Sequence, residues 1–123
     1  VFLEGIMSRR NKLTINNLCG KWIRFVRKGY YSKSHPKITQ EELTARLQVL
    51  GLKIDRSALS RIENGTRILS DIEVACFAYA LKVPIQFLYF GNEEKVPNVS
   101  MLSSIIADKY GDEEDDDEDF FPL

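Results

Sequence analysis

Apolar residues between positions 16 and 90 recur at spacings of three and four, the period of an amphipathic α-helix. In the first two helical segments, the residues expected to face inward are Leu18, Trp22, Ile23, Val26, Leu43, Leu47 and Leu50. The pattern predicts helices over residues 16–28, 40–50, 56–64, 71–82 and 84–90, and a weaker pattern predicts a sixth over 99–110. Because no segment alternates in the manner of a strand, we predict an all-α fold.

Between residues 38 and 74, the sequence contains three signals for the start of a helix. Thr39 with Glu42, and Ser70 with Glu73, have the spacing of a capping box, in which each side chain bonds the other's backbone amide. Asp55 is suited to accept a hydrogen bond from an amide in the first turn of the segment that follows it. These signals predict helices that begin directly after Thr39, Asp55 and Ser70.

The segment after Asp55 has two chemically different faces. Leu59 and Ile62 fall on one face, with Ala58 at its margin, and Gly65 ends the helix because glycine readily adopts positive φ. The opposite face carries Arg56, Ser57, Ser60, Arg61 and Asn64. Two short helices joined by a tight connection, the second with an outward face of this kind, form the pattern of a DNA-binding helix-turn-helix.

Composition changes the picture only when the chain is divided. The net charge of −1 hides a balance of +8 over residues 1–90, from 15 Lys or Arg against 7 Asp or Glu, and of −9 over residues 91–123. A basic domain with an acidic tail suggests a polyanion as the partner of the basic part. The 123 residues suffice for one domain with tails but not for two substantial domains.

Four regions follow from these patterns. Residues 1–15 are expected to form a basic N-terminal arm, with Val1 or Met7 as the start of the translated chain, and residues 16–91 a five-helix DNA-binding domain. Residues 92–110 are expected to form a linker and a candidate dimerisation helix, and residues 111–123 an acidic, disordered tail. Surplus apolar residues predict a dimer surface from Phe87, Leu88, Phe90, Met101, Leu102 and Ile105.

Other function classes find little support in the sequence. No apolar run is long enough to span a membrane and the first residues lack the pattern of a secretory signal, which together favour the cytoplasm. Cys19 and Cys76 match no metal spacing, and His35 has no cluster of acidic or cysteine residues around it. We therefore expect no metal, no cofactor and no catalytic residue, and we do not expect an enzyme.

Three stretches, "ITQEELTARL", "SALSRIENGTR" and "SDIEVACFAYALKVPIQFLY", closely resemble the phage Cro and repressor-type helix-turn-helix domains of the XRE family, over roughly residues 18–90. The resemblance implies a structural ion pair between Arg27 and Glu63. It implies base contacts by Arg56, Ser57 and Arg61, and contacts to the DNA backbone by Gln40, Ser60, Asn64 and Arg67. The chain departs from the family pattern through a longer "YYSKSHPK" loop and a longer "QVLGLKI" connection, and both departures weaken the transfer of backbone contacts.

The expected function is that of a sequence-specific regulator of transcription that binds double-stranded DNA. Repression by a homodimer that occupies a two-fold-related operator is the expected mode, since one such domain touches only a few base pairs. One alternative is an antitoxin or antirepressor whose residues 91–123 bind a protein partner, and another is a protein-interaction adaptor without DNA affinity. For the acidic tail, the sequence leaves three roles open: a solvating segment, a docking site for a partner, or a competitor of DNA for the basic domain.

Overall fold

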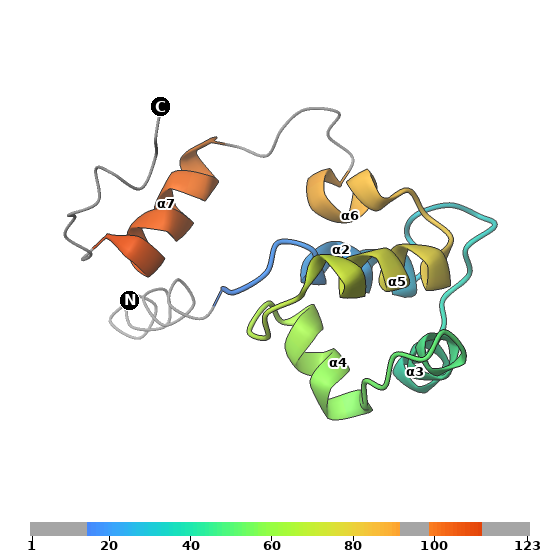
Figure 1. Cartoon of the computed structure of the whole chain (residues 1–123). Helices are drawn as coiled ribbons and strands as arrows, with labels where there is room; N and C mark the ends of the chain where they lie inside the picture. The colour runs from blue at the N-terminus through green and yellow to red at the C-terminus, as the bar shows by residue number, and fades with distance from the viewer. Residues whose placement is uncertain (1–14, 92–98, 112–123) are drawn as a thin grey trace, which may run out of the picture. The chain divides into compact units, whose positions relative to one another are not determined.

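The structure of this chain is a computed structural model that describes residues 15–91 and 99–111 (Figure 1). The chain divides into two compact units. The first comprises residues 14–96, and the second comprises residues 1–13 together with residues 97–123. Every regular element in the described ranges is a helix, so the all-α prediction is confirmed there. The helices are α2 (Gly20–Arg27), α3 (Gln40–Val49), α4 (Arg56–Glu63), α5 (Asp71–Leu81), α6 (Ile85–Phe90) and α7 (Val99–Tyr110).

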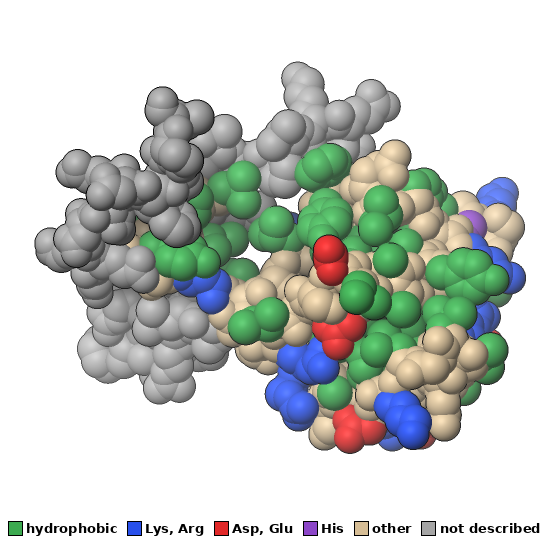
Figure 2. Space-filling view, in the orientation of Figure 1, with side chains coloured by type: hydrophobic (Ala, Val, Ile, Leu, Met, Phe, Trp, Pro, Cys, Tyr) green, Lys and Arg blue, Asp and Glu red, His purple; other side chains and the backbone are tan. Residues whose placement is uncertain are grey.

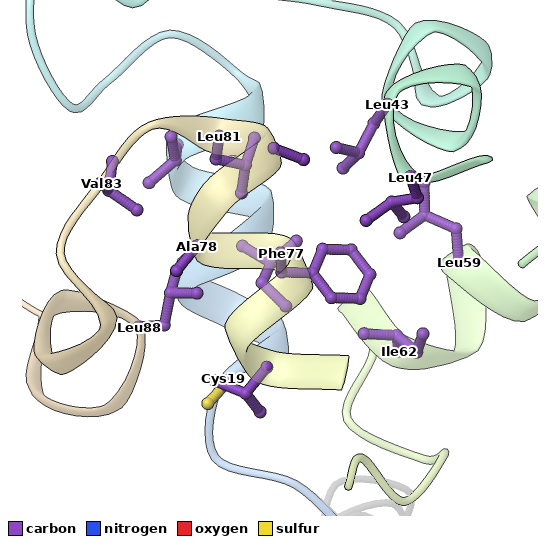
Figure 3. Close-up of a cluster of buried hydrophobic side chains, with 14 of the residues drawn as sticks. Cys19, Leu43, Leu47, Leu59, Ile62, Phe77, Ala78, Leu81, Val83 and Leu88 are labelled. Carbon is purple, nitrogen blue, oxygen red and sulfur yellow. The ribbon is translucent and has the colours of Figure 1, made fainter. Parts of the chain in front are cut away.

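The core of the first unit forms where the apolar faces of α2 to α6 meet. α2 contacts α4, α5 and α6, while α3 contacts α4 and α5, so each helix in the unit has at least two neighbours. Figure 3 shows the Phe77 ring of α5 directed toward Leu47 of α3 and toward Leu59 and Ile62 of α4. These four side chains are fully buried. The spacing that predicted the helices therefore also identified Leu47, Leu59 and Ile62 as inward residues, but it did not single out Phe77 of α5.

The three expected helix caps are present, although only one forms a complete capping box. Ser70 Oγ accepts from the Glu73 amide at 3.1 Å, and the Glu73 carboxylate accepts from the Ser70 amide at 3.0 Å. Asp55 Oδ1 accepts from the Ala58 amide at 2.8 Å. Thr39 Oγ1 accepts from the Glu42 amide at 3.0 Å, but the Glu42 carboxylate pairs with Arg46 at 3.0 Å instead of closing the box.

Six predicted helix ends differ from the structure, five of them by a single residue, and three of the six have a clear local cause. α2 begins at Gly20 and not at residue 16, because the Asn17 side chain accepts a hydrogen bond from the Gly20 amide at 2.6 Å and residues 15–17 stay outside the helix. Leu50 follows the end of α3 and is exposed, since Gly51 turns the chain away at φ +93°. Pro84 precedes α6 as its N-cap, in extended geometry, and is not its first helical residue.

The predicted dimer surface is also partly wrong. Phe87 and Leu88 lie in the core of the first unit, where they cover α2 and α5, so a second chain cannot contact them. Leu102 and Ile105 of α7 are half-buried, and the Met101 side chain lies outside the described part of the chain. Most of the basic arm, the linker over residues 92–98 and the acidic tail over residues 112–123 also lie outside it.

Candidate nucleic-acid interface

The outward face of α4 presents polar and charged side chains to solvent. Ala58, Leu59 and Ile62 are buried against the core, which fixes the rotation of the helix about its own axis. The opposite side carries four exposed residues and one half-buried serine, namely Arg56, Ser57, Arg61, Asn64 and Ser60. The residues that the sequence singled out on this helix therefore share one accessible face.

A buried ion pair fixes α4 on the side opposite its exposed polar face. Arg27 Nε donates to Glu63 Oε2 at 2.6 Å, and Nη2 donates to Glu63 Oε1 at 3.0 Å, which makes the contact bidentate. A third guanidinium nitrogen donates to the Ile38 carbonyl at 3.1 Å. The two side chains are only 9% and 3% exposed. Bidentate pairs impose geometry as well as attraction, so this contact ties the end of α2 to the last turn of α4.

Gln40 links the start of α3 to two successive turns of α4. Its Nε2 lies 3.3 Å from Ser60 Oγ and 3.2 Å from Glu63 Oε1, and its Oε1 accepts from Arg56 Nε at 3.4 Å. The side-chain amide is thus engaged on the protein at both ends. To contact a phosphate, it would have to exchange one of these bonds, of which the one to Arg56 is the most exposed and the longest.

Two asparagines that no sequence pattern singled out secure the turn after α4. Asn17 Nδ2 donates to the Ile62 carbonyl at 3.2 Å and to the Arg67 carbonyl at 2.7 Å. The Asn16 amide donates to the Gly65 carbonyl at 2.6 Å, and Asn16 Nδ2 donates to the Thr66 carbonyl at 2.8 Å. The Asn-Asn pair ahead of the first helix was the available signal, because asparagine favours caps and side-chain contacts to backbone.

Close backbone packing makes this arrangement possible. A Cβ atom on Gly20 would lie 1.9 Å from the Ile62 carbonyl oxygen, which no side chain can accommodate without a shift. α2 and α4 therefore touch through their backbones at this point. Together with the Asn17 contacts, this approach fixes the position of α4 relative to α2.

An open, polar groove of about 530 Å³ lies where the end of α2, the start of α3 and the outward face of α4 converge. Four cationic side chains line it in addition to the buried Arg27: Arg24, Lys28, Lys37 and Arg56. Glu41 and Glu63 are its carboxylates, and each pairs with an arginine, Arg56 and Arg27 respectively. With those pairs counted as neutral, Arg24, Lys28 and Lys37 leave the groove electropositive.

The structure divides the predicted site residues into two groups. Gln40, Arg56, Ser60 and Asn64 line the groove, whereas Ser57, Arg61 and Arg67 do not. Arg67 is half-buried and its guanidinium approaches the Glu73 carboxylate at 3.4 and 3.5 Å. No sequence pattern described above assigned a role to Arg24 and Lys28. Their place in the groove depends on the approach of α2 to α3, which no local pattern reveals.

Cys19 and His35 both make contacts within the fold. Burial raises the pKa of the Cys19 thiol to about 12, so it is not a thiolate at neutral pH. His35 Nε2 contacts the Lys82 carbonyl at 3.0 Å, and its Nδ1 contacts Ser32 Oγ at 2.6 Å. Within the described ranges, no group of three or more potential metal ligands forms, and no helix has the length and apolar character needed to cross a bilayer.

Comparisons of this chain with protein-family models, with curated proteins and with solved structures found no match.

Proposed function

We propose that this chain is a sequence-specific, double-stranded DNA-binding regulator of transcription that reads base edges with the outward face of α4. The observation that carries the proposal is the polar face of α4, which is accessible on its outer side and held from behind by the Arg27–Glu63 pair. A helix that only faces solvent does not need a buried, bidentate ion pair to fix its position. A helix that contacts DNA bases must be held in a fixed position. The resemblance to the XRE family, from which the repressor-like helix-turn-helix assignment comes, points to the same function.

The dimensions and chemistry of α4 suit a major groove. An α-helix with its side chains is about 10–12 Å across, and the major groove of B-DNA is about 12 Å wide. Arginine is the commonest reader of guanine, through O6 and N7, and serine bonds to several bases. Arg56, Ser57 and Arg61 are therefore the proposed readers, while Ser60 and Asn64 are proposed contacts to the DNA backbone.

Cations around the groove supply the sequence-independent part of the binding. Arg24, Lys28 and Lys37 lie beside the reading face and would contact the phosphates that flank it. Gln40 joins this set by exchanging its contact to Arg56 for a phosphate oxygen. Repression by occupancy is the simplest mode of regulation, because it requires only that the bound site be covered. A homodimer on a two-fold-related operator would give useful specificity.

The decisive experiment is the selection of bound sequences from a random duplex library, followed by anisotropy titrations of the recovered site and of a scrambled duplex. We expect a recurrent half-site and an affinity that falls steeply with salt. For about 5–8 phosphate contacts per dimer, the slope of log K against log salt lies between about −4 and −7. No enrichment, or a slope near zero, would contradict DNA binding.

An antitoxin or antirepressor is the second candidate, in which the C-terminal residues bind a protein partner. It is favoured by α7, whose Ile106 and Tyr110 are 54% and 57% exposed and lie one turn apart on the helix. Recovery of a stoichiometric partner with the full chain, lost when Ile106 is replaced by Lys, would support this candidate. Unchanged purity and mass after the same replacement would exclude a partner bound through this face of α7.

A further inference from the structure

α5 carries apolar side chains on two opposite sides, although Asp71 and Glu73 lie in its first turn. Its inward face, with Val74, Phe77, Ala78 and Leu81, is buried in the core. The opposite side carries a second stripe at spacings of three and four. It is made of the exposed Ile72, Ala75 and Tyr79, with the half-buried Cys76 at its edge, and we call it the outer stripe. A helix that is apolar all round is normally covered on all sides.

The outer stripe is nevertheless open within the described unit. Ile72 is 71% exposed and Tyr79 is 72% exposed, and Ala75 between them is also exposed. In Figure 2, hydrophobic side chains are spread over the region of α5 and α6 that faces the viewer. None of the residues that line the basic groove comes from α5. A partner on the outer stripe would therefore leave the groove accessible.

We propose that the outer stripe is the interface between two copies of this chain, which pack α5 against the partner's α5 in antiparallel orientation around a two-fold axis. Two-fold dimers use the same patch on both subunits, so the patch must be complementary to itself. The outer stripe meets this condition in its apolar contacts and in its flanking charges. This inference concerns protein association and stands independently of whether the chain binds DNA.

The order of side-chain sizes along the stripe fits an antiparallel pair. The midpoint between Ile72 and Tyr79 lies between Ala75 and Cys76, which are small enough to let two helix backbones approach closely. With the two-fold axis at this midpoint, Ile72 of one copy meets the partner's Tyr79, and the reverse contact forms at the other end. Large side chains then fill both ends of the interface while small ones occupy its centre.

Charge complementarity selects the antiparallel over the parallel orientation. Asp71 at the start of α5 and Lys82 just after its end are both exposed, and neither has an ion-pair partner in the described part of the chain. They lie at opposite ends of α5, about three turns apart. Rotation about the proposed axis brings Asp71 beside the partner's Lys82 at each end. A parallel pair would oppose like charges.

The small size of the stripe sets the expected strength. Stable interfaces bury about 800 Å² on each partner, and one face of a three-turn helix provides less than that. The dimer should therefore be weak and dependent on protein concentration, with a dissociation constant on the order of micromolar. Such a dimer would form fully only at high concentration, or where two copies are held together on adjacent half-sites.

The first test is sedimentation of the full chain at concentrations from about 1 to about 200 µM, where mass action must shift the mean mass. We expect the wild type to move from monomer to dimer and Ile72→Lys to remain monomeric over the whole range. Val49→Lys is the matched control, because Val49 is 86% exposed but lies on α3. Equal dimerisation of all three proteins would overturn the proposal.

Charge reversal provides the sharper test. Asp71→Lys and Lys82→Asp should each weaken the dimer about threefold or more at low salt, and the double variant should restore it to within about twofold of the wild type. Aspartate tolerates the left-handed conformation of residue 82, at φ 61°, so folding is retained. Failure of the double variant to recover would exclude the antiparallel pairing, even where Ile72→Lys is monomeric.

Other occupants of the stripe predict different results. A covering segment from the same chain would leave the wild type monomeric at every concentration and make Ile72→Lys less stable to heat. A heterologous protein would leave the purified chain monomeric and Ile72→Lys as stable as the wild type. Each result overturns the homodimer. Neither bears on duplex binding by a single domain, so failure here is distinct from failure of the proposed function.

Discussion

α4 and α5 both bury an apolar face in the same core, yet their outward faces have opposite chemistry. α4 exposes Arg56, Ser57 and Arg61, and α5 exposes Ile72 and Tyr79. Packing in the core explains why the inner faces of both helices are apolar. It does not explain the residue types on either outer face. The composition of an exposed face is therefore the part of the sequence most free to respond to a partner.

The two helices also differ in how they are held. α4 is fastened by polar contacts from α2 and α3, through the Arg27–Glu63 pair and Gln40, whereas α5 is held by Phe77 and its apolar neighbours. Directional hydrogen bonds fix the orientation of a helix, as a reader of bases requires. α5 also receives a directional contact, from Arg46 Nη1 to the Ala80 carbonyl at 3.1 Å, but its packing in the core is mainly apolar.

The largest effect on stability is expected from loss of the buried Arg27–Glu63 ion pair. Glu63→Ala leaves the Arg27 guanidinium buried without its partner, which should lower the free energy of unfolding by about 3–5 kcal/mol. Urea unfolding followed by circular dichroism measures this loss. The matched control is Glu42→Ala, which removes the exposed pair with Arg46 and should cost less than about 1 kcal/mol. Equal losses in both variants would mean that burial of the clamp adds nothing.

The next effect concerns the readers on α4. Arg61→Ala should cost about 1–3 kcal/mol of discrimination at one position of the selected site, because arginine on a guanine edge forms two hydrogen bonds. Lys37→Ala is the matched control: it removes a groove cation and should weaken all duplexes alike while reducing the salt slope by about 1. Competition titrations with single-base variants of the site separate the two cases. If both variants behave like Lys37→Ala, Arg61 contacts phosphate.

The local parts of this contrast could be predicted from the sequence. The caps at Asp55 and Ser70, and the buried set around Leu59 and Ile62, follow from rules that act within a few residues. The outward face of α4 could be predicted for the same reason, since it is the side opposite that buried set. The ion pair between Arg27 and Glu63 was expected only through a family resemblance, because the two residues are far apart in the sequence.

The parts that depended on tertiary packing could not be predicted. The surplus of apolar residues wrongly predicted a dimer surface at Phe87 and Leu88, because the sequence does not reveal that α6 covers α2 and α5. The outer stripe escapes prediction for a related reason. Between Ile72 and Tyr79 every residue except Glu73 is apolar, and so a periodicity argument cannot tell which side is covered. Arg24 reaches the groove only because α2 ends beside α3.

An intermediate effect on stability is expected at the starts of the two helices. Ser70→Ala removes the Ser70 half of the box at α5 and should cost about 1–2 kcal/mol, because the Glu73 amide loses its acceptor and the reciprocal bond loses support. Asp55→Ala removes the single cap of α4 and should cost about 1 kcal/mol. Urea midpoints for the two variants provide the comparison. A larger loss at Asp55 than at Ser70 would show that the reciprocal bond of the box adds nothing to the cap of α5.

The smallest effect on stability is expected at Arg56, although its effect on recognition should be large. Its pair with Glu41 spans 3.2 Å between side chains that are 66% and 70% exposed. Solvent screens such a pair, and holding two long side chains together costs entropy, so Arg56→Ala should change the free energy of unfolding by less than about 0.5 kcal/mol. The same variant should lose base discrimination, because the guanidinium is then absent from the reading face.

Glu41→Gln is the informative companion: it frees Arg56 without removing it, and reduces the negative charge near the phosphates. We expect this variant to bind all duplexes more tightly at low salt, with unchanged base preference. Weaker binding by Glu41→Gln would indicate that the carboxylate positions Arg56 for recognition and does not compete with DNA.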